Sequence, residues 1–254
     1  MPIQMGKHRI AFWLHKTTGP ATYFFKGVYL ALSPFEFFWK RYMESNLNDP
    51  EVYDSIEKYL KEGAIFLDIG ANMGVFSLLA AKQKNARVFA FEPSFRELQR
   101  FHHNITINPT IGDKITVFPY GLADREKTQT FYLSPAHHSG MNSVLDLSSI
   151  TKENTPVQCH FNKISNLLSV AMLQQVALCK IDVEGYEVEV LRGLEESMPY
   201  LNEAVFIVEI SPAYLKQAGA TKEDIYEFFG RWNFTGSDSP PTDGRQYNEL
   251  FIRK

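Results

Sequence analysis

The chain has 254 residues, 44% hydrophobic and 22% charged, a composition typical of a soluble globular protein. This length is enough for one large domain with a sizeable core. The formal net charge of -3 is too small to indicate binding to nucleic acid or to an anionic membrane, and we expect no nucleic-acid partner.

The two cysteines, Cys159 and Cys179, do not form a CxxC pair. A disulfide framework or a zinc site is therefore not expected, and a reducing compartment, the cytoplasm, fits best. The first residues carry early basic side chains but no long apolar run, so we do not expect a signal peptide.

Residues 1–50 are predicted to form an aromatic-rich helical arm or cap, with a boundary in the polar stretch SNLNDP. Lys26, Pro34 and Glu36 interrupt its apolar stretch well short of a membrane-spanning length. Four roles stay open for the arm. It could pack on the core, form a homodimer contact, lie peripherally on a membrane, or cover a substrate.

After this boundary, short apolar runs alternate with amphipathic helical patterns. The predicted strands are 64–70, 86–93, 115–123, 176–182 and 204–211, with a last strand at 248–254. The predicted helices are 75–83, 94–108, 188–198 and 221–232. This alternation predicts an α/β fold with a mainly parallel sheet covered by helices on both faces, which binds ligands at the carboxyl ends of its strands. The irregular segment 128–161 is predicted to be an inserted hairpin or lid over that crevice.

The stretch FLDIGANMGVFS is the most specific signal in the sequence. A strand runs into a turn with Gly70 and Gly74 and then into a helix, whose first N–H groups are unpaired. The dinucleotide fingerprint is not met, because Asn72 and Val75 stand where its second and third glycines would be. Asp68 would face a pyrophosphate unfavourably, whereas an acid suits a ligand with a positive group.

Glu92 ends the second strand, 22 residues after Gly70. A carboxylate at this place can accept hydrogen bonds from both hydroxyls of a ribose. S-adenosylmethionine has a ribose, an amino group and a sulfonium, and it has no phosphate. The loop and Glu92 together therefore favour this cofactor over a dinucleotide.

FLDIGANMGVFS, FEPS, LCKIDVEGYEVEVLRG and IVEISP resemble the FkbM family of S-adenosylmethionine-dependent methyltransferases. The resemblance covers roughly residues 51–254, and KIDVEGYE is its most specific block. It implies a class I methyltransferase fold, Rossmann-like, with a seven-stranded, mostly parallel sheet that has one antiparallel strand at its edge. It also implies O-methylation, with sugars, glycans or other hydroxylated natural products as typical acceptors. We expect the cofactor to be bound by Asp68, Gly70, Asn72, Gly74, Glu92, Pro93, Ser94, Gly121, Leu122 and Asp182.

Three charged residues, Lys180, Asp182 and Glu184, lie at the end of the fourth strand. Strand side chains alternate between faces, so these three point the same way if the extended geometry persists. Lys180 can then pair with one of the acids. Asp182 either contacts the cationic end of the cofactor or the acceptor hydroxyl, or caps the next helix. Capping alone also accounts for Glu184, and Glu187 is expected on a solvated helix face.

The expected catalytic residues are Asp182, Glu209 and His138. A sugar hydroxyl is a weak nucleophile, so a general base helps, and His138 with its neighbour His137 is a candidate near neutral pH. Exposed loop histidines are the alternative. Asp182 and Glu209 offer oxygen ligands for a divalent metal, but no third ligand of matching spacing appears, and we expect none to be bound.

The adenine is expected beside 120–123 at the end of the third strand, with Asp124 accepting from its amino group. This rests on fold analogy. Two other functions stay open, an NAD(P)-dependent oxidoreductase and a non-catalytic cofactor-binding scaffold on the same fold. A nucleic-acid methyltransferase is weaker, because no basic stripe interleaved with aromatic residues is present.

Overall fold

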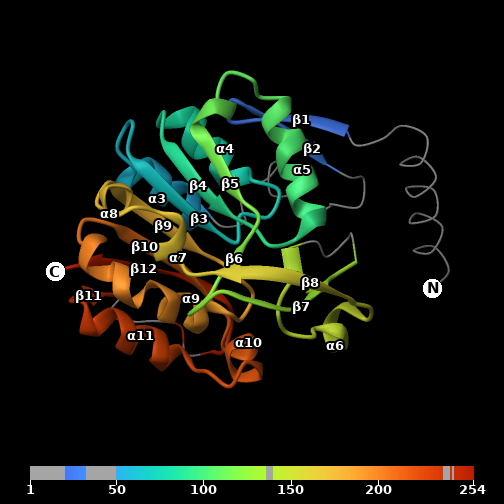
Figure 1. Ribbon diagram of the computed structural model, residues 1–254, viewed down its shortest axis with the longest axis vertical. Coiled ribbons are helices and arrows are strands. Elements are labelled where there is room, and N and C mark those ends of the chain that lie inside the picture. Colours follow the sequence, from blue (N-terminus) through green and yellow to red (C-terminus); the bar gives the residue numbers. More distant parts are fainter. Residues whose placement is uncertain (1–20, 33–49, 136–139, 237–240, 242) are drawn as a thin grey trace.

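The computed structural model describes residues 21–32, 50–135, 140–236, 241 and 243–254 (Figure 1). Within this part, seven strands form one sheet in the order β11-β12-β10-β9-β3-β4-β5. Their bounds are β3 Ile65–Ile69, β4 Arg87–Phe91, β5 Ile115–Phe118, β9 Val176–Ile181, β10 Val205–Ile210, β11 Phe234–Thr235 and β12 Tyr247–Arg253. Strands β3, β4, β5, β9 and β10 are parallel, which confirms the predicted fold class.

The antiparallel strand is β12, which pairs with β10 on one side and with β11 on the other. It therefore lies one place inside the edge, where the sequence led us to expect it at the edge itself. The two-residue strand β11 is too short to give an apolar pattern, so the sequence does not predict it.

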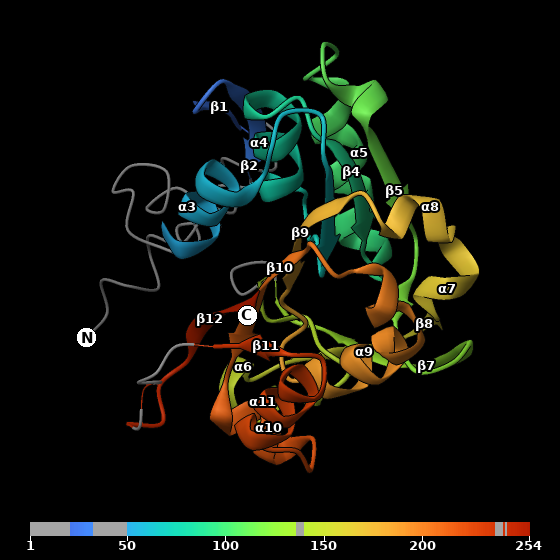
Figure 2. The ribbon, with the colours of Figure 1, turned by 90° about the vertical axis from the view of Figure 1, so that its left-hand side faces the viewer.

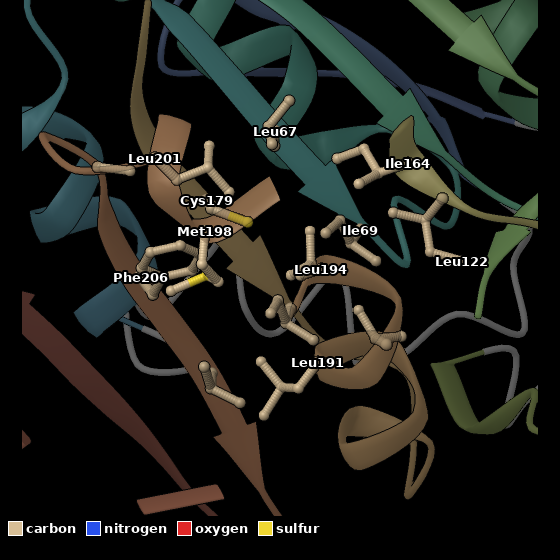
Figure 3. Close-up of a cluster of buried hydrophobic side chains, with 14 of the residues drawn as sticks. Leu67, Ile69, Leu122, Ile164, Cys179, Leu191, Leu194, Met198, Leu201 and Phe206 are labelled. Carbon is tan, nitrogen blue, oxygen red and sulfur yellow. The ribbon is translucent and has the colours of Figure 1, made fainter. Parts of the chain in front are cut away.

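Helices cover both faces of the sheet, as Figure 2 shows with α3 and α4 on one side and α9 and α11 on the other. The first group is α3 Pro50–Tyr59, α4 Val75–Gln83 and α5 Phe95–Thr106, and the second is α9 Glu187–Leu194, α10 Pro212–Gln217 and α11 Lys222–Arg231, with short helices α7 Ile164–Leu167 and α8 Val170–Leu173. Each group buries an apolar cluster against its face of the sheet. Figure 3 shows the second cluster, in which Ile69, Cys179 and Leu194 come together from β3, β9 and α9.

A second, three-stranded sheet stands beside the main one, with the order β6-β8-β7. Its strands are β6 Gly121–Leu122, β7 Lys127–Leu133 and β8 Thr155–Asn162, and the helix α6 Ser148–Thr151 lies between the last two in sequence. β7 and β8 are antiparallel. The apolar run 115–123, predicted as one strand, is thus divided between β5 in the main sheet and β6 in the second.

The described part of the N-terminal arm is a β-hairpin and not the predicted helix. β1 Ala21–Phe25 and β2 Val28–Leu32 pair through a two-residue turn in which Lys26 and Gly27 both have positive φ, 46° and 93°. Such a turn suits the twist of a hairpin. The rest of the predicted arm, 1–20 and 33–49, lies outside the described residues.

The hairpin is part of the main core. Leu30 is fully buried in the same cluster as Met73 and Phe76. Asn104 of α5 accepts a hydrogen bond from Ala31 N (2.8 Å) and donates one to the Met73 carbonyl (3.0 Å). The hairpin therefore supports the loop that follows β3. None of the described helices is long and apolar enough to cross a membrane.

We expect Leu30→Ala to destabilise the protein by about 2–5 kcal/mol, because it opens a cavity in the shared core. Phe24→Ala is the control, since Phe24 lies in the same hairpin but is 67% exposed, and its removal should cost much less. Chemical denaturation of both variants measures the difference. Equal, small effects would mean that the hairpin is a detachable appendage.

Candidate cofactor and acceptor site

A cavity of about 330 Å³ opens at the carboxyl ends of β3, β4, β9 and β10. Eight of the residues predicted for binding or catalysis line it: Gly70, Asn72, Glu92, Pro93, Gly121, Leu122, Asp182 and Glu209. Asp68, Gly74 and Ser94 lie behind this lining. His138, with His137, lies outside the described residues. The cavity is also lined by residues that the sequence did not single out, among them Met141, Asn142, Tyr186 and Tyr214.

A side chain at either glycine of the loop after β3 would collide with a neighbour, and the neighbour differs between the two. Gly70 has φ 79°, and a Cβ there would lie 1.8 Å from the Asp182 carbonyl oxygen. Gly74 has φ 83°, and a Cβ there would lie 2.0 Å from the ring of Phe101. The loop thus packs directly on the segment after β9 and on α5. Between the glycines, Asn72 also has a positive φ of 51°.

Glu92 is held by the backbone at the end of β4. Its Oε2 accepts from Asn72 N (2.8 Å) and its Oε1 from Ser94 N (2.9 Å). The side chain is 5% exposed, and this burial raises the pKa of Glu92 to about 8, against the lowering effect of the two backbone donors. Ser94 is the N-cap of α5, so Glu92 is fixed to the start of that helix.

Lys180, in the lining of the cavity, pairs with two acids. Its Nζ lies 2.9 Å from Asp182 Oδ2 and 3.7 Å from Asp68 Oδ1, as the sequence prediction of a Lys180–acid pair requires. Ser77 donates to Asp68 Oδ2 at 2.6 Å. Burial raises the pKa of Asp68, although the charge of Lys180 opposes this, and the two acids raise the pKa of Lys180, which outweighs its burial. Asp68 is thus the buried counter-ion of Lys180, and it does not line the cavity.

Asp182, Glu184 and Glu209 come together in the lining of the cavity, with one carboxylate oxygen from each within 4.8 Å of the others. The sequence offered only two oxygen ligands at this place, and the structure adds Glu184 as a third. Three such oxygens suit a hard divalent cation in number and type. They equally suit hydrogen bonding to hydroxyl groups, because an ionised carboxylate is a strong acceptor.

The segment 182–185 has an unusual backbone. Glu184 and Gly185 have φ values of 54° and 98°, so the strand geometry assumed for Glu184 ends before it. Ser143 Oγ donates to the Glu184 carbonyl (2.7 Å), and Gly185 N donates to Glu187 Oε1 (3.0 Å). A left-handed conformation costs a non-glycine residue about 1–2 kcal/mol, so the surrounding contacts must hold Glu184 in place.

Glu187 is 1% exposed, so its predicted place on a solvated helix face is wrong. It turns inward to accept from the backbone of the 182–185 segment, and burial raises its pKa to about 7. The pattern D-x-E-G-x-E, with an acid two residues after a turn glycine, is the signal that could have revealed this role.

The other predicted residues have ordinary surroundings. Asp124 pairs with Arg125 (2.9 Å) and Lys127 (3.0 Å) outside the cavity, so the structure gives no support to its predicted contact with adenine. His102 and His103 are exposed on α5. His160 lies on β8, where its Nδ1 is 2.9 Å from Thr128 Oγ1. Cys159 and Cys179 are buried free thiols.

A mostly parallel sheet with this strand order has a glycine loop after β3, a buried acid after β4, an acid after β9 and another near the carboxyl end of β10, and together these define a class I methyltransferase-like fold. The family model of the methyltransferase FkbM domain matches residues 68–235, and the chain belongs to this family. S-adenosylmethionine, the methyl donor expected from the sequence, is the cofactor that this membership supports.

The chain is 29% identical over 195 residues to the AMB antimetabolite synthetase AmbE of Pseudomonas aeruginosa, covering 60% of this chain and 9% of that protein. It is 28% identical over 167 residues to the hexuronic acid methyltransferase AglP of Haloferax volcanii, covering 65% of this chain and 61% of that protein. The matches thus span less than two thirds of either relative. A solved structure from Clostridium thermocellum, described as a candidate rRNA methylase, matches at TM-score 0.50 with 12% identity, covering 80% of this chain and 93% of the other. At this identity the likeness concerns the fold alone.

Proposed function

We propose that this protein transfers the methyl group of S-adenosylmethionine to a hydroxyl oxygen of a sugar, a glycan or another hydroxylated small molecule. The observation that supports this most is a single cavity lined both by a buried, backbone-held carboxylate, Glu92, and by a cluster of three carboxylates, Asp182, Glu184 and Glu209. We assign the part of the cavity at this cluster to the acceptor and call it the acceptor end.

The residues on the Glu92 side fit the cofactor. The Gly70 turn packs so closely on the Asp182 carbonyl that any Cβ would collide with it, and this close packing brings the loop backbone to the cavity. Glu92, already oriented by two N–H donors, is placed to accept from ribose hydroxyls. Gly121, Leu122 and Pro93 supply an apolar wall for the adenine. Asp182, which lies 2.9 Å from Lys180 Nζ and lines the cavity, would accept hydrogen bonds from the amino group of the cofactor.

When bound, S-adenosylmethionine supplies an electrophilic methyl carbon on a sulfonium. The chain must align the acceptor oxygen with the carbon–sulfur bond and take up the hydroxyl proton as the oxygen–carbon bond forms. Glu209 and Glu184 are the carboxylates available for this proton at the acceptor end. Glu209 is 8% exposed and lines the cavity, so its carboxylate can reach an acceptor bound there.

The acceptor end also indicates the charge of the acceptor. Asp182, Glu184 and Glu209 contribute three acids to the cavity, and Lys180 is the one basic residue in its lining within the described part of the chain. A substrate carboxylate would meet like charges here, whereas a neutral polyol can donate its hydroxyls to them. Tyr214 and Gln246 line the same cavity and suit the apolar face and the remaining hydroxyls of a sugar. We therefore favour a neutral sugar over a hexuronic acid.

A transfer assay with labelled S-adenosylmethionine tests this proposal. Neutral mono- and oligosaccharides should accept the label on oxygen, and the matching uronic acids should accept it poorly. Glu209→Gln should lower kcat by about 10²–10⁴-fold, as loss of a general base does, without changing cofactor affinity. Labelling of a uronic acid carboxyl in preference to any neutral sugar would contradict the acceptor class, and labelling of an amine or a base would contradict O-methylation.

A further inference from the structure

The segment 140–144 of the insertion forms one wall of the cavity, to which Met141, Asn142 and Val144 contribute. Asn142 is 9% exposed, and its amide makes three hydrogen bonds. The oxygen accepts from Arg96 (2.9 Å) and from Ser134 N (3.0 Å), and the nitrogen donates to Glu97 Oε1 (3.2 Å). The two bonds to Arg96 and Glu97 leave the insertion and reach the first turn of α5.

Glu97 is a rigid anchor for this amide. It is fully buried, and both flanking arginines satisfy its charge, with Arg96 Nε 2.9 Å from Oε1 and Arg100 in contact with Oε2. Arg96 also donates to the Ser134 carbonyl (2.7 Å), so two points of the insertion are attached to the same helical turn. This turn begins at Ser94, whose N–H holds Glu92. Asn142 is therefore linked through Glu97 and Ser94 to Glu92, the acid that we propose to bind the ribose.

The next residue, Ser143, reaches in the opposite direction. Its Oγ donates to the carbonyl of Glu184 (2.7 Å), and its backbone pairs with Tyr132 of β7. Two consecutive residues thus connect the wall that carries Glu92 to the segment that carries Glu184. Val144 packs against the small apolar cluster of the second sheet. The two residues before it, Asn142 and Ser143, are held by hydrogen bonds.

We propose that Asn142 is a positioning residue that couples the cofactor side of the cavity to its acceptor side. Cofactor binding at Glu92 restricts the motion of the start of α5. Through the hydrogen bonds of Asn142, this restriction extends to Ser143 and to the segment that carries Glu184. The inference rests on the proposed function in one respect, that the ligand at Glu92 is S-adenosylmethionine. Asn142 itself takes no part in the chemistry.

Hydrogen exchange with and without S-adenosylhomocysteine tests the coupling in the full chain. In the wild type, the ligand should slow exchange about tenfold in peptides covering the 70–74 loop and also in those covering 143–145 and 183–185. In Asn142→Ala, the loop should keep its protection and 143–145 should lose most of its own, while 183–185, which adjoins the proposed cofactor contact of Asp182, should keep only the protection that this contact gives. Asn154→Ala is the matched control, because Asn154 bonds to Asp146 and Thr151 within the insertion, away from the cavity, and it should behave as the wild type.

Thermal unfolding of each variant checks that it is folded. If Asn142→Ala does not fold, Asn142→Asp replaces it, since it keeps the accepting oxygen and replaces the donation to Glu97 by repulsion between two carboxylates. Protection of the loop without protection of the other segments in the wild type, or full protection in a folded Asn142 variant, would overturn the coupling. No protection anywhere would instead show that the cofactor assignment itself has failed, and the coupling with it.

Discussion

Replacement of Lys180 by methionine should destabilise the protein by about 3–5 kcal/mol, the usual cost of breaking a buried ion pair from one side. Lys180 is 4% exposed and lies between Asp68, which is 1% exposed, and Asp182. Without it, a buried carboxylate is left with no cation. For a chain of this size the loss corresponds to a fall in Tm of about 6–20 °C. Scanning calorimetry of both proteins measures it.

The pH dependence of this loss follows from Asp68. Its pKa is already raised by burial, and removal of the Lys180 charge raises it further. A carboxyl with a raised folded-state pKa loses stability as pH rises, so the destabilisation should shrink on acidification from pH 8 to pH 5. Lys163→Met is the control. Lys163 pairs with Glu196 at 2.6 Å, but Glu196 is 68% exposed, and such surface pairs contribute at most about 1 kcal/mol. Equal effects of the two changes would contradict a buried Lys180 pair.

The second large effect is expected from Gly70→Ala. The new methyl group would lie 1.8 Å from the backbone oxygen of Asp182, which a side-chain rotation cannot relieve. The β3 loop and the segment after β9 must then separate, and both line the cavity. We expect a loss of at least about 3 kcal/mol in stability, from strain and overpacking together, and loss of measurable cofactor binding.

Gly63→Ala is the control that separates the cost of the backbone conformation from the cost of the collision with Asp182. Gly63 has nearly the same φ, 75° against 79°, but a Cβ there meets nothing within 4 Å. Its cost should be that of the backbone conformation alone, about 1–2 kcal/mol, with cofactor binding unchanged. If Gly70→Ala were as mild as Gly63→Ala and still bound cofactor, the close contact between the two loops would be wrong.

The sheet is predictable because its central strands are buried on both faces and give unbroken apolar runs. Where this signal is weak, the prediction fails. β11 has two residues, and the run 115–123 contains a bend at Pro119 and Tyr120 that a continuous apolar pattern conceals. The hairpin of β1 and β2 is wrongly predicted as a helix, although Lys26-Gly27 between aromatic and β-branched runs is a turn signal.

The cofactor side of the site is predictable from local chemistry, because packing alone rarely requires both a glycine turn and an acid at the ends of neighbouring strands. Asp68 shows the limit of this reasoning. The sequence places it at the strand end, but only the fold shows that Lys180 and Ser77 occupy it. Glu184 is assigned by strand alternation, and its positive φ breaks that rule while still bringing it to Asp182 and Glu209. The contacts of Asn142 depend on the position of the insertion, which no local pattern specifies.

Calorimetric titration of S-adenosylhomocysteine into the wild type and Glu92→Gln, between pH 6 and pH 9, tests the central claim most directly. Glu92 has a pKa of about 8 before ligand binds, and ribose hydroxyls donate to its ionised form. Affinity of the wild type should therefore rise about tenfold per pH unit up to pH 8 and then level off. Glu92→Gln should bind about 100-fold more weakly at pH 9, the worth of two hydrogen bonds to a charged group, without this pH dependence. Absence of binding by the folded wild type, or identical profiles for the two proteins, would contradict the account.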